Sequence, residues 1–266
     1  MTDADAERCF FSQAQNTILH VPMPKCPSFA KRQPTAITFR KEAVIMSNKL
    51  PATVQCKHCQ HTIETELWET INTATDPELK AAVRDRTAFL FECPECSEKS
   101  YLDYGFLYHQ PEDRILIQYA TDDDTIRNML ACLKAPKENN PLAPFMDAEY
   151  IIRLVRSQDR LTEKLRILDD GLDDRIMEIY KALALLNYDS EHPDKNNTEV
   201  YYFHAADGSH QLQVFIDKKY ECSSLFNQKM YQNLVQQFSP KLPPIRKDWP
   251  LIDEKWAMHL LTEDDE

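Results

Sequence analysis

Two cysteine pairs with the same spacing constrain the fold of this chain more than any other feature. They are Cys56-Lys57-His58-Cys59 and Cys93-Pro94-Glu95-Cys96. A Cys-x2-Cys pair forms a tight turn that directs both thiolates toward one point, and two such turns supply the four sulfurs of a tetrahedral Zn²⁺ site. Because four protein ligands leave no open coordination position, a site of this kind holds a fold together. We therefore predict one structural Zn²⁺ per chain, bound by Cys56, Cys59, Cys93 and Cys96, and we assign no catalytic residue and no other cofactor.

The cysteine pairs also allow two other interpretations, namely thiols that bind nothing or a redox disulfide. A thioredoxin-like motif has a single Cys-x2-Cys in a βαβ setting, whereas this chain has two pairs in a segment rich in strand patterns. The 33 residues between Cys59 and Cys93 exceed the usual spacing of such zinc sites, and a predicted helix over 77–85 accounts for the excess. His58 and His61 could replace a sulfur, but four cysteines suffice, so we expect both to be exposed turn residues.

Glycine is unusually rare, which excludes several classes of function. The chain contains only Gly105, Gly171 and Gly208, whereas average usage would give about 19. No glycine-rich loop exists that could bring backbone N–H groups against a phosphate, so the P-loop, the dinucleotide-binding fingerprint and the G-x-S-x-G elbow of many hydrolases are absent. The net charge of −12 also opposes contact with nucleic-acid phosphates. We expect no nucleic-acid partner.

The chain has the sequence properties of a cytoplasmic protein. None of its apolar runs approaches the roughly 20 residues that cross a bilayer, and no segment combines the charged, apolar and small-residue regions of a secretory signal. We therefore expect a reducing, cytoplasmic location and no membrane contact. The four other cysteines are then expected to be unpaired thiols: Cys9, Cys26, Cys132 and Cys222.

The first 49 residues differ in pattern from the rest of the chain. They contain four scattered prolines between short apolar fragments, with neither helical nor strand periodicity. We predict that residues 1–49 are disordered or are an untranslated extension. The second interpretation rests on Met46 as an alternative start, since codons for Lys41-Glu42-Ala43 can contain a bacterial ribosome-binding sequence at a suitable distance upstream.

Residues 50–135 are predicted to form a zinc-ribbon-like domain. Mixed apolar and polar positions over 62–68 indicate a half-buried strand. Asp76-Pro77 is typical of a helix start, so a short helix is expected over 77–85. Further strands are predicted over 89–91, 101–108 and 115–119, with a turn over 109–113. Each cysteine pair would then lie beside a β-hairpin, with the helix inserted between the pairs.

Residues 145–266 are predicted to form a separate C-terminal region. The prolines of 136–146 mark the boundary before it. A helix with an apolar stripe is expected after Asp147, and Gly171 interrupts the stripe before a second helical stripe begins. This pattern predicts a bent helix pair or a helical hairpin.

The remainder of the C-terminal region contains strand and helix signals. Asp207-Gly208 lies between two alternating segments, 199–205 and 211–216, and predicts a β-hairpin. Helices are expected over 224–238 and after Asp253. The predicted fold class is therefore α+β: zinc-ribbon-like β-hairpins with a helical insertion, followed by a helix pair, a β-hairpin and C-terminal helices.

Two acidic clusters and one histidine are further candidate functional groups. Asp122-Asp123-Asp124 lacks the loop ligands of an EF-hand, so we interpret it as a charged helix start. His109 follows a tyrosine in a proline turn, where contact with solvent or a local hydrogen bond is expected. Helix capping is the simpler account of the carboxylates around the glycine break, and acid–base or metal chemistry is the alternative; these residues are Asp169, Asp170, Asp173 and Asp174, with Arg175 beside them.

Several segments around the cysteines resemble the bacterial and archaeal CpXC domain, which is named for two cysteine-proline-x-cysteine motifs. The resemblance covers about residues 50–120 and is carried by both cysteine pairs, Leu67-Trp68, Asp76-Pro77-Glu78-Leu79-Lys80, Phe91-Glu92-Cys93-Pro94-Glu95-Cys96 and Leu107-Tyr108-His109. Segments 166–174 and 252–257 are similar to parts of longer members. The resemblance implies a zinc-binding domain without catalytic residues. The first pair departs from the motif at Lys57, and Gln60 and Ser97 stand where many zinc ribbons have glycine.

These observations predict a non-enzymatic binding or interaction module that contains a structural four-cysteine zinc site. Its partner is expected to be another protein, and the sequence does not determine an oligomeric state. One alternative is an enzyme or small-molecule binder with its site in the C-terminal half, near Gly171. Another is a thiol sensor that loses zinc when its cysteines are oxidised.

Overall fold

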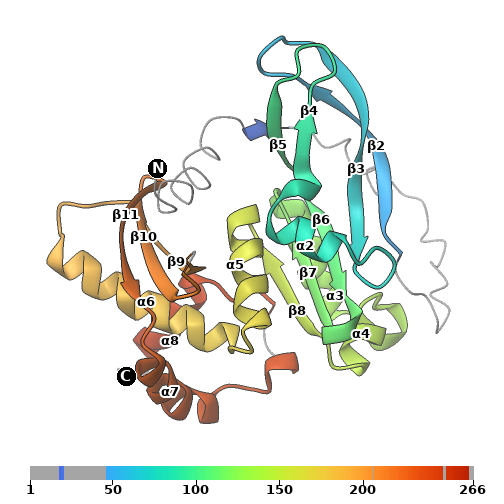
Figure 1. Ribbon diagram of the computed structural model, residues 1–266. Coiled ribbons are helices and arrows are strands. Elements are labelled where there is room, and N and C mark those ends of the chain that lie inside the picture. The colour runs from blue at the N-terminus through green and yellow to red at the C-terminus, as the bar shows by residue number, and fades with distance from the viewer. Residues whose placement is uncertain (1–17, 21–45, 206, 248–249, 264–266) are drawn as a thin grey trace. The chain divides into compact units, whose positions relative to one another are not determined.

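The computed structural model describes residues 18–20, 46–205, 207–247 and 250–263. The chain divides into two units, one within Thr17–Gln158 and the other within Asp159–Glu266 (Figure 1). Except for 18–20, the residues before 46 lie outside the described part, and so does most of the segment predicted to be disordered. Among the described residues, no helix has the length and apolar character needed to cross a bilayer.

A five-stranded mixed sheet forms the centre of the first unit. Its strand order is β2-β3-β6-β7-β8, and the neighbouring pairs are alternately antiparallel and parallel. The middle strands are almost completely buried, as their apolar sequences require. The strands are β2 (Asn48–Gln55), β3 (Thr62–Asn72), β6 (Phe106–Gln110), β7 (Ile115–Tyr119) and β8 (Ile151–Val155).

A second, smaller sheet of this unit has the order β1-β5-β4. Its strands β4 and β5 are antiparallel, and β1 runs parallel to β5. The strands are β1 (Ile18–His20), β4 (Leu90–Glu92) and β5 (Lys99–Asp103), and the segment between β3 and β4 contains helix α2 (Leu79–Arg84) and the 3-10 turn η2 (Thr87–Phe89). The helix predicted between the cysteine pairs is therefore confirmed. The strand predicted over 101–108 is two strands, separated at Tyr104 and Gly105.

The remaining helices of the first unit follow β6 and β7. They are η3 (Pro111–Asp113), α3 (Asp123–Lys134), η4 (Lys137–Asn139) and α4 (Ala143–Asp147). Helix α3 begins at the acidic triplet, where the Asp122 side chain accepts a hydrogen bond from the Thr125 backbone N–H at 2.7 Å. The interpretation of Asp122-Asp123-Asp124 as a helix start is confirmed.

Strand β8 corrects the prediction of a helix after Asp147. All five residues of β8 are buried, and they pair in parallel with β7. A strand buried on both faces has a continuous apolar run instead of an alternating one, so Ile151, Leu154 and Val155 also match a helical stripe. The two units divide after Gln158, which leaves the prolines of 136–146 inside the first unit.

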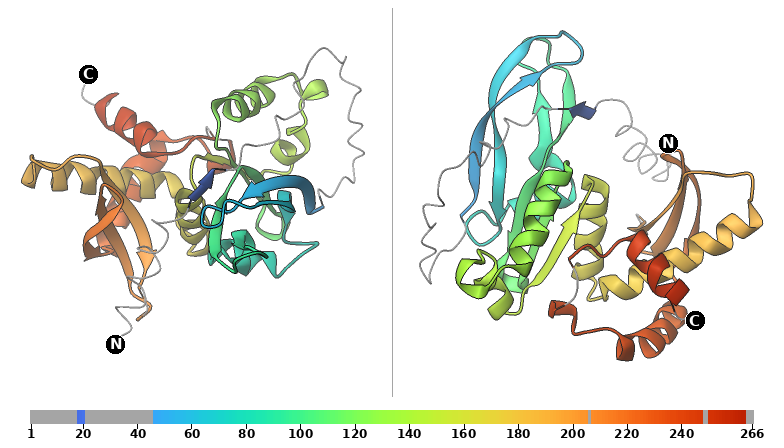
Figure 2. Two further views of the ribbon diagram at one scale, coloured as in Figure 1. Left: turned by 90° about the horizontal axis from the view of Figure 1, so that it is seen from above. Right: turned by 180° about the vertical axis from the view of Figure 1, so that it is seen from behind.

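The second unit packs helices against a three-stranded antiparallel sheet of order β11-β10-β9 (Figure 2). Its core joins α6, β9, β10, α7 and α8. The elements are α5 (Gln158–Asp169), which begins at the boundary, α6 (Asp174–Glu191), β9 (Thr198–His204), β10 (His210–Ile216), β11 (Lys219–Leu225), α7 (Gln228–Phe238), η5 (Ser239–Lys241), η6 (Ile245–Lys247) and α8 (Glu254–Glu263). The helix pair, the hairpin and the last two helices were predicted, whereas β11 was not. All seven residues of this edge strand are exposed, so they give no burial pattern.

The break between α5 and α6 confirms the role predicted for Gly171. Gly171 has φ +68°, its N–H donates to Leu168 O, and the Leu172 N–H donates to Ile167 O, both at 3.1 Å. This pair of bonds is the Schellman motif, which ends a helix at a left-handed residue. The chain then turns, and Asp173 caps α6 by accepting a hydrogen bond from the Arg175 N–H at 3.0 Å.

Candidate metal centre

Each cysteine pair forms the turn of a β-hairpin. Cys56 to Cys59 connects β2 to β3, and Cys93 to Cys96 connects β4 to β5. The two turns have the same backbone hydrogen bonds: Cys56 N–H to His61 O at 2.9 Å, Gln60 N–H to Cys56 O at 2.8 Å, Cys93 N–H to Glu98 O at 2.9 Å and Ser97 N–H to Cys93 O at 2.8 Å. The matched spacing in the sequence thus produces two turns of matched geometry.

The residue after each cysteine pair adopts a left-handed backbone. Gln60 has φ +61° and Ser97 has φ +57°, although neither is glycine. L-residues are less stable than glycine in this conformation because the Cβ crowds the following carbonyl. The Gln60 side chain compensates in part, since its Nε2 donates to Lys57 O at 2.7 Å. The absence of glycine therefore leaves the turn geometry intact.

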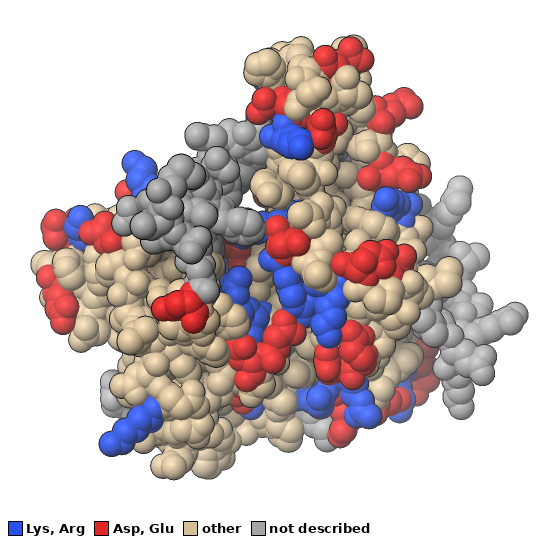
Figure 3. Space-filling model, in the orientation of Figure 1, with Lys and Arg blue, Asp and Glu red and all other residues tan. Residues whose placement is uncertain are grey.

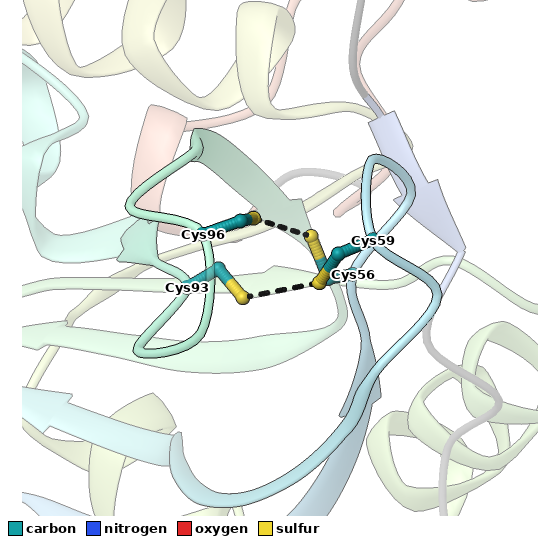
Figure 4. Close-up of side chains that lie close together, drawn as sticks. All are labelled: Cys56, Cys59, Cys93 and Cys96. Atoms are coloured by element: carbon teal, nitrogen blue, oxygen red, sulfur yellow. Dashed lines mark hydrogen bonds between the residues drawn. The ribbon is translucent and has the colours of Figure 1, made fainter.

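The two turns bring four sulfurs together from opposite hairpins (Figure 4). The Cys56 and Cys96 sulfurs are 3.7 Å apart, as are the Cys59 and Cys93 sulfurs. All four sulfurs lie within 4.8 Å of one another. A tetrahedron with metal–sulfur bonds of about 2.3 Å has edges of about 3.8 Å. The cluster is close enough to hold one metal ion.

Burial differs between the two members of each pair. Cys56 and Cys93 are 4% and 1% exposed, while Cys59 is exposed and Cys96 is partly exposed. The first cysteine of each pair thus faces the interior of the ribbon, and the second faces the solvent side. A metal ion bound by the four sulfurs would therefore have two buried ligands and two ligands near the solvent.

The environment of the sulfurs separates their acidities. The backbone N–H of Cys59 is the main group that lowers the pKa of Cys56, to about 6. The backbone N–H of Glu98 favours the Cys96 thiolate, but partial burial and the three nearby sulfurs raise the pKa of Cys96 to about 12. The cluster thus favours the Cys56 thiolate and disfavours the Cys96 thiolate, and a bound cation would favour the thiolate form of all four cysteines.

The flanking histidines do not join the sulfur cluster. His58 is exposed, and His61 Nε2 lies 3.8 Å from Glu95 Oε1 of the other turn, with both side chains 56% exposed. Neither histidine is in the group of four close ligands. The prediction that both are exposed turn residues is confirmed.

His109 differs from its expected position in an exposed turn. It is only 4% exposed because strand β6 extends through it. Its two ring nitrogens contact Asn72 Nδ2 at 3.3 Å and Tyr150 Oη at 3.1 Å. Of the two expected contacts, the one with solvent is wrong, and the hydrogen bond is present but joins His109 to residues distant in the sequence.

The carboxylates near Gly171 have different roles. Asp173 caps α6, as capping predicts, and Asp174 is fully buried 3.2 Å from Lys164 Nζ. Asp170 instead approaches two histidines, His204 and His210, which with it form a second group of close ligand atoms. Both histidines were missed in the sequence. Their signal was their placement at either end of the predicted hairpin turn, where an antiparallel register sets them opposite each other.

The remaining cysteines do not contribute to the sulfur cluster. Cys132 is partly exposed and Cys222 is exposed, and both are free thiols, as expected. Cys9 and Cys26 lie outside the described residues. Among the cysteines in the described part of the chain, only the four of the two pairs form a group with metal-ligand spacing.

The family comparison agrees with this site. Residues 54–181 match the model of the CpXC family, described as CpXC protein. The chain therefore contains a segment that matches the CpXC family. The matched segment contains both cysteine turns and continues through the Gly171 break into α6, while 252–257 lies beyond it. No curated protein and no solved structure matches the chain.

Proposed function

We propose that Cys56, Cys59, Cys93 and Cys96 bind one structural Zn²⁺ and that this ion stabilises a non-enzymatic binding module. The observation that carries the proposal is the convergence of four sulfurs from two matched turns. Four thiolates in a tetrahedral arrangement favour zinc or iron–sulfur chemistry. Two separate Cys-x2-Cys turns on hairpins are the usual framework of a zinc ribbon. With four protein ligands, the ion has no position for a substrate.

The ends of the hairpins that carry the cysteines bury few apolar side chains. None of the three residues of β4 is buried, only Val54 is buried in β2, and the buried residues of β3 begin at Leu67, away from the turn. The cysteine turns therefore gain little stability from apolar burial of their own. Zinc binding in small domains supplies on the order of 10 kcal/mol at neutral pH. The ion is therefore proposed to be part of the fold.

We test the metal by elemental analysis of protein prepared without chelators. The wild-type chain should contain about one zinc for the four-cysteine site, and Cys93→Ser should lose it. Cys132→Ser is the matched control, because it removes a partly exposed cysteine of the same unit that is outside the cluster. Wild-type protein without metal, or with iron in place of zinc, would contradict the assignment.

We further propose that the partner of the module is another protein, in a reducing cytoplasm that preserves the thiolates. The closed coordination shell argues against catalysis at the ion. Acidic and basic side chains are interspersed on the face shown in Figure 3. The acidic net charge of the chain opposes phosphate binding. Leu50 on β2 and Leu90 on β4 are 42% and 41% exposed, so both hairpins offer apolar contact surface.

The partner proposal is tested by cross-linking in cells, followed by mapping of the linked peptides. Cross-links from a protein partner should map to the hairpins within 50–104 and should be lost in Cys93→Ser but kept in Cys132→Ser. Cross-links that avoid the hairpins, or that persist without the metal ligand, would overturn it.

A thiol sensor is the second candidate, and the exposure of Cys59 favours it. Oxidation of an accessible zinc thiolate would release the ion and unfold the hairpins. Under this alternative, mild peroxide should release zinc reversibly, and a thiol reductant should restore the metal content. Zinc that stays bound under peroxide would reject the sensor and leave the structural site intact.

A further inference from the structure

The second unit contains a cluster of histidine and carboxylate side chains that the four-cysteine site does not use. His204 ends β9 and His210 begins β10, and the two are directly opposite in the antiparallel register. Their rings stack with centroids 4.5 Å apart and an interplanar angle of 26°. The hairpin thus presents two imidazoles side by side.

Asp170 reaches these histidines from the break between the helices. The Schellman motif at Gly171 ends α5 and places Asp170 at the last turn. Asp170 Oδ2 lies 2.6 Å from His204 Nε2 and 4.0 Å from His210 Nδ1. One ligand atom from each of the three residues lies within 4.8 Å of the other two.

The hydroxyl group of Tyr202 contacts two members of the cluster, Asp170 and His210. The buried tyrosine side chain donates from Oη to Asp170 Oδ2 at 2.7 Å, and the same oxygen lies 2.5 Å from His210 Nδ1. These contacts hold the carboxylate and the His210 ring in place, and His210 Nδ1 would exchange its contact with the tyrosine for one with a bound ion. Arg166 donates to the backbone oxygen of Tyr202 at 3.4 Å and lies over the Phe203 ring.

We propose that Asp170, His204 and His210 bind one divalent transition-metal ion of the zinc class at a site separate from the four cysteines. Two imidazoles and one carboxylate suit zinc and its neighbours, and this ligand set is found in sites with open positions. Ligand atoms about 2.0–2.2 Å from a tetrahedral ion are about 3.4 Å apart. When an ion binds, the 2.6 Å distance between Asp170 Oδ2 and His204 Nε2 would increase. The 4.0 Å distance between Asp170 Oδ2 and His210 Nδ1 would decrease. Each change is less than about 1 Å.

The site has the accessibility and the charge that a labile cation needs. Asp170, His204 and His210 have side chains that are 18%, 36% and 41% exposed. Metal ligation requires deprotonated ligands, and in that form one carboxylate and two imidazoles carry a net charge of −1, which attracts a cation. Three protein ligands leave room for water, in contrast to the closed sulfur site. The ion is therefore held with an accessible coordination position.

Equilibrium dialysis against Zn²⁺ tests the proposal with untagged full-length protein. At saturation the wild type should bind two zinc ions per chain, and His204→Gln and His210→Gln should each bind one. The control His192→Gln removes a histidine of the same unit that stacks on Tyr188 away from the cluster, and it should bind two. Cys93→Ser should still bind one, which separates this inference from the four-cysteine proposal.

Cobalt provides a second readout that identifies the ligand atoms. Protein whose sulfur site is already filled with zinc should take up Co²⁺ and show weak visible bands without sulfur-to-cobalt charge transfer. His210→Gln should lower this affinity at least about tenfold. A wild type that binds only one zinc, equal binding by the His204 variant, or cobalt bands from sulfur alone would overturn the second site.

Discussion

At the scale of single residues, Gln60 and Ser97 test how much the left-handed backbone after each cysteine pair costs in stability. Ser97 has φ +57°, and no side-chain hydrogen bond is described for it, whereas Gln60 has φ +61° and donates to Lys57 O. Ser97→Gly should stabilise the zinc-loaded protein by about 1 kcal/mol, because glycine tolerates this conformation. Gln60→Gly should gain less, since it loses the hydrogen bond to Lys57.

Denaturant unfolding of both variants beside the wild type checks this expectation. A destabilised Ser97→Gly protein would show that the serine hydroxyl contributes more than its backbone conformation costs.

The two cysteine turns were predictable from the sequence because the spacing within each pair is local. Cys56 and Cys59 share one turn, and so do Cys93 and Cys96, so each pair needs only a few residues to set its geometry. That each close sulfur contact joins the two turns could not be predicted, because it depends on how the hairpins pack. Asp170 was considered in the sequence, but its two histidine neighbours come from a hairpin more than 30 residues away.

At the scale of helices and strands, Gly171 provides the clearest test. A Cβ added at Gly171 would meet no atom within 4 Å, so the cost of a substitution comes from its φ of +68° alone. Gly171→Ala should lower stability by about 1–2 kcal/mol. Gly171→Asn should lower it less, because asparagine visits the left-handed region more readily. Thermal unfolding of the pair measures the difference, and a stabilised alanine variant would contradict the helix break.

Buried charges on α5 and α6 predict a pH dependence. Glu178 is buried and accepts hydrogen bonds from Lys164 Nζ at 3.2 Å and Lys181 Nζ at 3.0 Å. Burial favours the neutral acid, but the two ammonium groups outweigh it and lower the pKa of Glu178 from 4.5 to about 2. Its contribution to stability is therefore complete above pH 4.5 and is lost as the pH falls toward 2.

Glu178→Gln should lower stability by about 1–3 kcal/mol at neutral pH, because Lys164 and Lys181 each lose one of two buried carboxylate partners and keep only Asp174 and Glu163, respectively. The variant should also lose less stability than the wild type between pH 4.5 and pH 2. Urea unfolding at pH 7 and pH 3 measures both effects, with the exposed Glu191→Gln as a control on the same helix. Equal pH slopes for wild type and Glu178→Gln would refute the assignment.

Three of the strands that could not be predicted lie at the extremes of burial. β8 is buried on both faces, β2 is mostly exposed and β11 is exposed along its whole length, so none has the alternation that marks a strand. β9 and β10 each bury four successive residues, and the Asp207-Gly208 turn signal between them made their hairpin predictable. Uniform burial or exposure therefore hides a strand in its sequence pattern, whereas a strong turn signal reveals it.

At the scale of the whole molecule, the two units should depend on the proposed four-cysteine metal to different degrees. The first unit contains both cysteine turns, while the second has its own apolar core that joins α6, its sheet, α7 and α8. The proposed three-ligand site of the second unit lies at its surface, so loss of that ion should leave its core folded. A metal that is structural in the first unit should thus affect only that unit.

Hydrogen exchange before and after chelation is the most direct test of a structural metal. We expect residues 54–104 to lose protection when the metal is removed, because the cysteine turns gain little stability from apolar burial of their own. Residues 159–266 should keep most of their protection. Unchanged protection around Cys56 and Cys93 would contradict the account, and uniform loss across both units would show that the chain unfolds as one cooperative domain.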